Sequence, residues 1–247
     1  MAFKDHFSQH ANVYSRYRPS YPWAMFRWLA AQLDSVDTVW DCATGNGQAA
    51  HDWAHVARRV IATDASANQI HSAVGHPRIT FRCASAEHSG LDDHSVDIVS
   101  VAQALHWFDQ PAFYTEARRV LRPGGILAVW TYRLCRVSAA IDPILRTLAW
   151  ETLDSYWPPE RDHVENEYRG ILPNWQPLAT PRFDVRADWT LEQLLGYLSS
   201  WSSVQRCRRM TGHDPLAELH EPLRQLWGDG RRMVSWPLVW FVYRKPG

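Results

Sequence analysis

The sequence predicts an α/β fold built around a mostly parallel sheet. Between residues 38 and 132, short apolar segments of strand length alternate with segments whose apolar residues recur at helical spacing, which is typical of βαβ units. A loop containing two glycines follows the first apolar segment and leads directly into a helical pattern. The 247 residues suffice for one such domain with a modest insertion.

Five strands are expected in this region. They are Thr38–Cys42, Arg59–Asp64, Ile79–Ala84, Val96–Ala102 and Ile126–Tyr132. One connecting helix is expected to open at Gln48 and another to cover Asp109–Arg122. In the second helix Asp109 can cap the first turn, and the Pro-Gly-Gly segment at 123–125 is expected to end the helix and turn the chain into the next strand.

The pattern changes after Tyr132. Residues 139–156 look helical, residues 157–181 are rich in proline and loop-like, and residues 190–228 look mostly helical. An edge strand is expected at Phe183–Ala187 and a final strand at Ser235–Arg244. One domain over residues 1–247 therefore divides into an N-terminal lid and first helix (1–37), a sheet core (38–132), a helical elaboration with an edge strand (133–235) and a final strand (236–247).

Composition narrows the class of ligand and the compartment. The chain has 26 Lys and Arg against 26 Asp and Glu, so a small neutral or acidic substrate fits better than nucleic acid. No apolar run approaches membrane-spanning length, and the first residues lack a signal-peptide core. The four scattered cysteines indicate reduced thiols and a cytoplasmic location. No metal site is expected, and the oligomeric state is unspecified.

The glycine loop by itself leaves the cofactor open. The segment Gly45-Asn-Gly-Gln-Ala-Ala50 matches the dinucleotide fingerprint, and Asp64 follows Gly45 by 19 residues, where a ribose-binding acid falls in dehydrogenases. However, Asp41 lies four residues before Gly45, and a carboxylate so close would repel a pyrophosphate. It suits a ligand with an ammonium group and no phosphate, such as S-adenosylmethionine.

Three motifs together carry a family resemblance. Asp41-x-x-x-Gly-x-Gly47, Ala-x-x-Leu-His-Trp at 102–107 and Arg-Val-Leu-Arg-Pro-Gly-Gly at 119–125 resemble the class I methyltransferases of the type 11 group. The segments Tyr14–Pro22 and Tyr197–Ser203 are similar, more narrowly, to the trans-aconitate methyltransferase-like branch. The resemblance spans nearly the whole chain. It implies a Rossmann-like three-layer sandwich, with a mostly parallel seven-stranded sheet, an antiparallel last strand and a helical cap.

The resemblance also implies roles for individual residues, with S-adenosyl-L-methionine as cofactor and S-adenosyl-L-homocysteine as product. The methionine end would be held by the loop, the ribose by Asp64, the adenine by the end of the third strand and the sulfonium side by Gln103, while an N-terminal lid would clamp the cofactor carboxylate. The expected cofactor-binding residues are Tyr14, Arg18, Asp41, Ala43, Gly45, Gly47, Asp64, Ala65, Ser85, Ala86, Glu87 and Gln103.

Two positions depart from the usual pattern of the family. Ala43 stands where glycine is usual, and Ser85 stands where aspartate is common, so the backbone N–H of Ala86 is the expected adenine contact. Asp64 has a second interpretation, as the cap of the helix that follows it.

The methyl acceptor is expected to lie beside His106, which follows the carboxyl end of the fourth strand. His106, Trp107, Tyr132 and Trp201 are the expected substrate residues, and Trp150, Tyr156, Trp157 and Tyr197 are further candidates for the walls. A carboxylate nucleophile is ionised near pH 7 and needs no base, whereas a hydroxyl or ring nitrogen would use His106 as one. His106 has a purely structural interpretation as well.

The sequence thus predicts methylation of a small molecule, with a carboxylate oxygen slightly favoured as the acceptor. The alternatives that stay open are hydroxyl-O or ring-N methylation of an aromatic metabolite, an NAD-dependent oxidoreductase, and a cofactor-binding module without catalysis.

Overall fold

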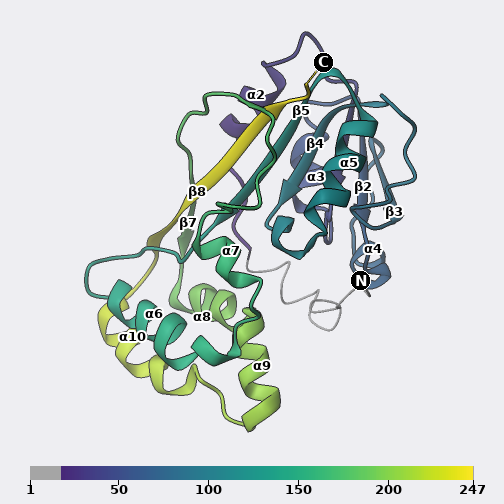
Figure 1. Cartoon of the computed structure of the whole chain (residues 1–247). Helices are drawn as coiled ribbons and strands as arrows, with labels where there is room; N and C mark the ends of the chain where they lie inside the picture. Colours follow the sequence, from purple (N-terminus) through teal and green to yellow (C-terminus); the bar gives the residue numbers. More distant parts are fainter. Residues whose placement is uncertain (1–17, 247) are drawn as a thin grey trace.

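The computed structural model describes residues 18–246. Figure 1 shows a sheet with helices on its faces and, at one end, a group of helices that forms a cap. The expected Tyr14 contact falls outside the described residues. No helix in the described part of the chain is long and apolar enough to cross a membrane.

Five parallel strands form the centre of the molecule. They are β1 (Thr38–Cys42), β2 (Arg59–Asp64), β3 (Ile79–Cys83), β4 (Val96–Ala102) and β5 (Leu121–Tyr132). The strand order is β3-β2-β1-β4-β5-β8-β6. The bounds of β1, β2 and β4 match the prediction, and β3 is one residue shorter.

The start of β5 corrects the prediction that the Pro-Gly-Gly segment lies before the strand. β5 begins at Leu121, which pairs with Val96, and the register shifts between Val96 and Ile98. Pro-Gly-Gly at 123–125 is therefore an irregular part of the strand. A Cβ at Gly125 would lie 2.9 Å from the carbonyl oxygen of Arg122, so glycine permits the close approach of the backbone there.

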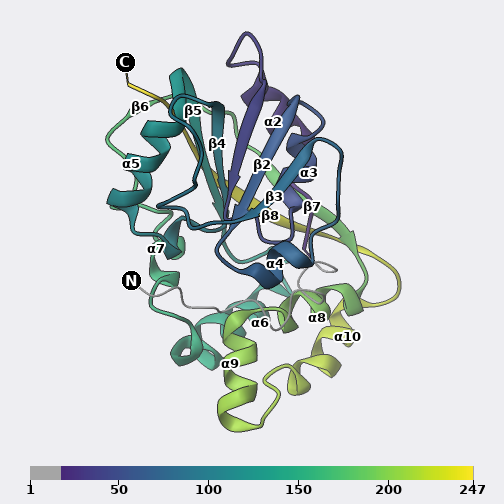
Figure 2. The same ribbon diagram turned by 90° about the vertical axis from the view of Figure 1, so that its right-hand side faces the viewer.

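Helices cover both faces of the sheet, as Figure 2 shows. On one face lie α2 (Trp23–Ala30) and α3 (Gln48–Trp53), which pack with Val39 and its neighbours; on the other lies α5 (Gln110–Val120), which packs with Trp40. α4 (Ala67–His71) follows β2. The predicted cap of α5 is confirmed, because Asp109 accepts a hydrogen bond from the backbone N–H of Ala112 at 3.2 Å.

The cap consists of short helices from the second half of the chain. They are α6 (Asp142–Thr147), the π-helical η2 (Leu148–Thr152), η3 (Asp154–Tyr156), α7 (Arg161–Glu165), α8 (Leu191–Ser199), α9 (Ser202–Thr211), η4 (Ala217–Leu219) and α10 (His220–Trp227). The prediction of helices over 139–156 and 190–228 is confirmed. The expected loop at 157–181 is wrong in part, because it contains α7 and the short strand β6 (Gln176–Pro177).

The last strand, β8 (Arg232–Arg244), joins the sheet to the cap. It runs antiparallel to β5, as expected, and starts three residues earlier than predicted. The edge strand β7 (Asp184–Trp189) pairs with the first half of β8, and β6 pairs with its last residues. The sheet therefore has eight strands where seven were expected.

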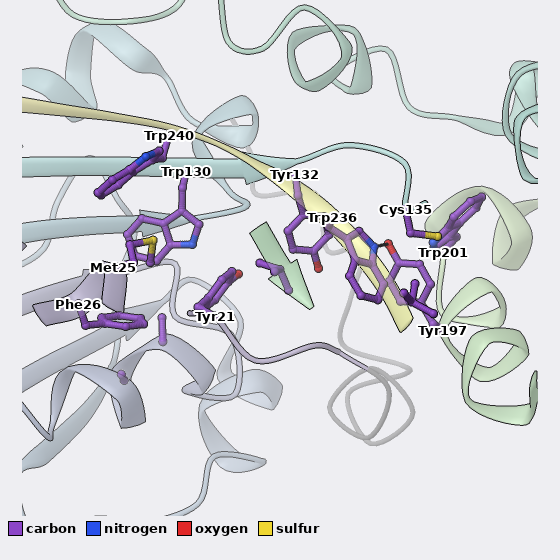
Figure 3. Close-up of a cluster of buried hydrophobic side chains, with 14 of the residues drawn as sticks. Tyr21, Met25, Phe26, Trp130, Tyr132, Cys135, Tyr197, Trp201, Trp236 and Trp240 are labelled. Atoms are coloured by element: carbon purple, nitrogen blue, oxygen red, sulfur yellow. Dashed lines mark hydrogen bonds between the residues drawn. The ribbon is translucent and has the colours of Figure 1, made fainter. Parts of the chain in front are cut away.

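A continuous cluster of aromatic side chains fixes the cap against the sheet. Figure 3 shows Tyr132 of β5 beside Trp236 of β8, with Tyr197 and Trp201 of the cap beyond them and Trp130 of β5 farther back, near Tyr21. The indole N–H of Trp236 donates a hydrogen bond to the Tyr197 hydroxyl at 3.0 Å, and their rings meet edge to face. This packing places the cap over the carboxyl ends of the strands.

Candidate active site

The candidate site lies where the strand order reverses. β1 pairs with β2 on one side and with β4 on the other, so the connections from their carboxyl ends diverge and leave a crevice. A cavity of about 680 Å³ opens there. This volume lies within the range of about 300–1,000 Å³ that is usual for small-molecule sites. We call it the cofactor cavity.

The glycine loop forms one wall of the cofactor cavity. Gly45 and Gly47 have positive φ of 59° and 94°, and a Cβ on Gly47 would lie 2.7 Å from the ring of Phe81. The backbone N–H of Gly45 donates to one carboxylate oxygen of Asp64 at 2.8 Å, and the N–H of Ser66 donates to the other at 2.8 Å. Asp64 thus links the loop to the start of α4.

The capping interpretation of Asp64 is wrong in detail. The cap residue of α4 is Ser66, whose hydroxyl accepts from the backbone N–H of Gln69. Asp64 instead faces the cofactor cavity, as a ribose-binding acid would. The cavity is lined by further predicted residues, namely Ala43, Gly45, Ala65, Ser85, Ala86, Glu87 and Gln103.

Asp41 and Gly47 differ from this group, because neither lines the cofactor cavity. Asp41 is fully buried, and the hydroxyls of Thr44 and Ser100 donate to its two carboxylate oxygens at 2.5 and 2.7 Å. Burial raises the pKa of Asp41 to about 6. Its carboxylate therefore fixes the loop through Thr44 and does not reach the cavity surface.

A second, smaller cavity of about 80 Å³ lies between the sheet and the cap; we call it the acceptor cavity. All four expected substrate residues, His106, Trp107, Tyr132 and Trp201, line it. Gln103 and Trp107 line both cavities, so the two spaces are neighbours. Of the further wall candidates, Trp157 and Tyr197 line the acceptor cavity, whereas Trp150 and Tyr156 do not.

Arg18 lies on the acceptor side, which differs from its expected place at the cofactor. One guanidinium nitrogen donates to the Tyr132 hydroxyl at 2.9 Å, and the group lies over the ring of Tyr197 at 5.5 Å from its centroid. Arg18 lines the acceptor cavity and is absent from the lining of the cofactor cavity. The contact with Tyr132 and Tyr197, which the sequence does not reveal, holds it there.

The charges of the two cavities are opposite. The charged side chains that line the acceptor cavity in the described part of the chain are Arg18, Arg133 and Arg161. Those that line the cofactor cavity in the same part are Asp64, Glu87, Asp109 and Glu160. Arg133 and Arg161 both contact Glu165, at 3.2 and 2.6 Å, and that acid is outside the lining. Arg133 also contacts Glu167 at 3.6 Å, so these acids offset part of the positive charge of the acceptor cavity. The linings themselves are cationic in the acceptor cavity and anionic in the cofactor cavity.

Gln103 stands at the junction of the cavities. Its φ is 57°, an uncommon conformation for a residue other than glycine. The side-chain oxygen accepts from the Thr131 hydroxyl at 3.0 Å, and the side-chain nitrogen is buried with no hydrogen-bond partner in the described part of the chain. A buried donor without a partner costs about 1–3 kcal/mol, which a ligand can remove.

His106 is held in the wall of the acceptor cavity. Its Nδ1 lies 3.1 Å from the hydroxyl oxygen of Tyr168. Burial, with a smaller effect from Arg161 and His163, lowers the pKa of His106 to about 3. The imidazole is therefore neutral at pH 7.

Sequence reasoning missed Arg133, Arg161, Thr131 and Tyr168. Arg133 directly follows the predicted residue Tyr132, and its position after a sheet strand was a usable signal. Arg161 and Tyr168 come from the segment that was expected to be a loop, where no pattern marks them. In the described residues no group of three or more metal-ligating side chains comes together.

The fold and the two cavities define a Rossmann-like protein with a cofactor cavity beside an acceptor cavity, and comparison with known proteins agrees. A family model described as "Methyltransferase domain" matches residues 40–129. A methyltransferase-family protein of Dictyostelium discoideum is 30% identical over 252 residues, which cover 98% of this chain and 96% of the relative.

Solved structures of methyltransferases also resemble this chain. One from Anaeromyxobacter dehalogenans, classed as a type II methyltransferase, is 42% identical and has a TM-score of 0.86, covering 92% of this chain and 97% of that one. A Haemonchus contortus phosphoethanolamine N-methyltransferase in complex with S-adenosyl-L-methionine shares the fold alone, at 14% identity and a TM-score of 0.54, covering 100% of this chain and 60% of that one. The chain belongs to the class I methyltransferase family, as its motifs predict.

Proposed function

We propose that the protein transfers a methyl group from S-adenosyl-L-methionine to a small anionic molecule, and that the accepting atom is a carboxylate oxygen. The observation that carries the proposal is the pair of neighbouring cavities with opposite charge, which meet at Gln103 and Trp107. Methyl transfer needs a cationic methyl donor and a nucleophile held in line, and these two cavities suit such a pair.

The cofactor cavity fits S-adenosylmethionine through its charge and its loop. The sulfonium and ammonium groups favour a cavity lined by Asp64, Glu87 and two more acids. Asp64 would bind the ribose hydroxyls, and the segment Ser85–Glu87 would border the adenine. When bound, the cofactor supplies the activated methyl group, and the residues of this chain orient it and exclude water.

The lining of the acceptor cavity suits the charge of a carboxylate group, and its volume of about 80 Å³ is smaller than that of usual small-molecule sites. Three guanidinium groups line it in the described residues, and arginine binds carboxylates through paired hydrogen bonds. Aromatic rings from Trp157 and Trp201, whose centroids are 5.5 Å apart, supply an apolar wall. A carboxylate is ionised near pH 7, so the reaction needs no base, which agrees with the low pKa of His106.

Two alternatives have less support. Methylation of a hydroxyl or ring nitrogen would call for a base, and a histidine with a pKa of about 3 is a weak one. An NAD-dependent oxidoreductase would place a pyrophosphate in a cavity lined by four acids. The small-molecule substrate, the cytoplasmic location and the trans-aconitate methyltransferase-like branch stay predictions.

The test uses the purified chain with methyl-labelled S-adenosylmethionine and a library of small carboxylic acids. We expect labelled products that base hydrolyses, as methyl esters do. Labelled products that all resist base would contradict transfer to a carboxylate. Thermal stabilisation by NAD and none by S-adenosylhomocysteine would contradict the methyltransferase itself.

A further inference from the structure

A carboxylate joins two arginines of the acceptor cavity, one from the sheet and one from the cap. Arg133 directly follows β5, whereas Arg161 and Glu165 lie one helical turn apart in α7. Glu165 Oε2 accepts a hydrogen bond from Arg133 Nε at 3.2 Å, and Glu165 Oε1 accepts from Arg161 Nε at 2.9 Å and from Arg161 Nη2 at 2.6 Å. Both arginines line the acceptor cavity, and Glu165 holds them from outside the lining.

The contact with Glu165 leaves one edge of the Arg161 guanidinium group available. This group has five N–H donors in a rigid plane, and Glu165 takes the donors on the Nε side. Among the residues that the structure describes, no other side chain or carbonyl accepts a hydrogen bond from Arg161. The remaining edge, between Nη1 and Nη2, can bind a carboxylate through two parallel hydrogen bonds.

Trp157 fixes the same guanidinium group from its face. Arg161 Cζ lies over the Trp157 ring, 4.7 Å from the centroid, where a cation is attracted to the aromatic face. The indole N–H of Trp157 donates to the carbonyl of Ala149 at 2.8 Å, which sets the orientation of the ring. Arg161 is thus held at one edge by Glu165 and at one face by Trp157. A side chain that is already ordered in this way loses less entropy when it binds a ligand.

Arg133 has a different part, because two acids contact it. Besides its hydrogen bond to Glu165, its Nη1 lies 3.6 Å from Glu167 Oε1. A carboxylate from a ligand would have to compete with both acids for Arg133, whereas Arg161 is paired with Glu165 alone in the described part of the chain. Arg133 therefore anchors Glu165 to the end of β5, and Arg161 is the better placed of the two to bind a ligand.

We propose that Glu165 is a positioning residue, which holds Arg161 so that the edge between Nη1 and Nη2 binds a carboxylate group of the acceptor molecule. This deepens the proposed function and rests on it for the identity of the bound acid as the methyl acceptor. Glu165 is itself an anion beside the site, so Coulomb repulsion alone would make it oppose the binding of an acid. Positioning and repulsion therefore predict opposite results when Glu165 is removed.

Titration of the ligand-free chain with acetate tests whether Arg161 binds a carboxylate. Arginine-labelled chain is examined by ¹⁵N NMR at constant ionic strength, with the Arg161 Nε signal assigned from its loss in Arg161→Lys. We expect acetate to shift this signal saturably and acetamide, which is neutral, to leave it in place. Arg208, whose Nε donates to Asp214 at 3.0 Å, is the internal reference. No shift at Arg161, or an equal shift at Arg208, would overturn the proposal.

The variant Glu165→Ala then separates positioning from repulsion. Alanine suits a helix and removes both accepting oxygens, so Arg161 loses the contact that fixes its edge. We expect the affinity for acetate at Arg161 to fall about 10-fold, although the variant has one negative charge fewer. An unchanged or higher affinity is the result of repulsion alone and would overturn the positioning role.

Glu221→Ala is the matched control. Glu221 also accepts two hydrogen bonds from one arginine, Arg224 of α10, and it lines neither cavity. Its loss should leave the affinity for acetate at Arg161 unchanged, and an equal fall in both variants would contradict a specific role of Glu165. The titration uses neither cofactor nor turnover. Acetate binding that depends on Glu165, in a chain that forms no methyl ester, would support the positioning role and contradict only the proposed function.

Discussion

The cofactor cavity and the acceptor cavity differ in where their residues come from. The cofactor cavity draws mainly on the ends of β1, β2, β3 and β4, within a stretch of about 70 residues whose strands follow one another in the chain. The acceptor cavity joins the ends of β4 and β5 to Arg18, α7 and the α8–α9 connection. The first is therefore fixed by local motifs and the second by the docking of the cap.

The largest effect is expected from a change at Asp64, one of the four acids that line the cofactor cavity. Asp64→Ala removes a carboxylate that accepts from two backbone N–H groups and faces the proposed ribose position. We expect roughly a 100-fold loss of affinity for S-adenosylhomocysteine in calorimetric titration, because the ribose hydroxyls would lose the two hydrogen bonds that they are proposed to donate to this carboxylate. The control Asp92→Ala, in an exposed loop, should bind as the wild type does. Equal affinities in the two variants would contradict the role.

The next prediction compares a glycine under the cofactor cavity with one in the cap. Gly47→Ala forces a positive φ and a contact with Phe81, so we expect about 2–4 kcal/mol of lost unfolding free energy. Gly212→Ala, at the end of α9, has φ of 70° and open space around a Cβ, so about 1 kcal/mol should be lost. Urea denaturation measures both. Losses of equal size would show that the contact with Phe81 is unimportant.

The charge of the acceptor cavity gives the third prediction. Arg161→Gln should lower kcat/KM for a carboxylic acid about 10-fold or more, because a charge-assisted hydrogen bond is lost, while affinity for S-adenosylhomocysteine stays the same. Arg169→Gln is the control, since Arg169 is exposed and lines neither cavity. If the affinity for S-adenosylhomocysteine fell as much as kcat/KM does, this would contradict the assignment of the substrate and the cofactor to separate cavities.

The smallest effect concerns pH. The pKa of His106 lies near 3 in the folded chain and near 6.5 when unfolded, so the unfolded chain binds the extra proton as pH falls below 6.5. The contribution of neutral His106 to the free energy of unfolding is intact above pH 6.5 and falls by about 2 kcal/mol between pH 6.5 and 5. The raised pKa of Asp41 acts in the opposite direction. The contribution of protonated Asp41 to the free energy of unfolding is lost as pH rises from about 4 to 6.

Urea denaturation at pH 7 and pH 5 checks this. On acidification from pH 7 to pH 5, the free energy of unfolding of His106→Gln should fall by about 2 kcal/mol less than that of the wild type, because glutamine does not titrate. The same loss in both proteins would show that His106 is protonated in the folded state.

The fold was largely predictable, because periodicity and glycine positions act over short stretches of chain. Three of the five central strands have the predicted bounds, and Asp109 caps its helix. The errors fall where distant contacts decide the conformation. The Pro-Gly-Gly segment joins β5 because β4 offers a bulged partner, and α7 forms within a proline-rich stretch.

By itself, the sequence determined the succession of strands and helices along the chain, the position of the glycine loop after the first strand, and the position of Asp64 at the end of the second strand. Each of these depends on residues that are neighbours in the chain. Only the tertiary structure decided that Arg18 and Arg161 face the same cavity as His106. It alone brings the Tyr168 hydroxyl, from the turn after α7, to 3.1 Å from His106 Nδ1. The reason is physical: burial between two layers sets the charge and hydrogen-bond partners of these groups, and no local pattern records which layers will meet.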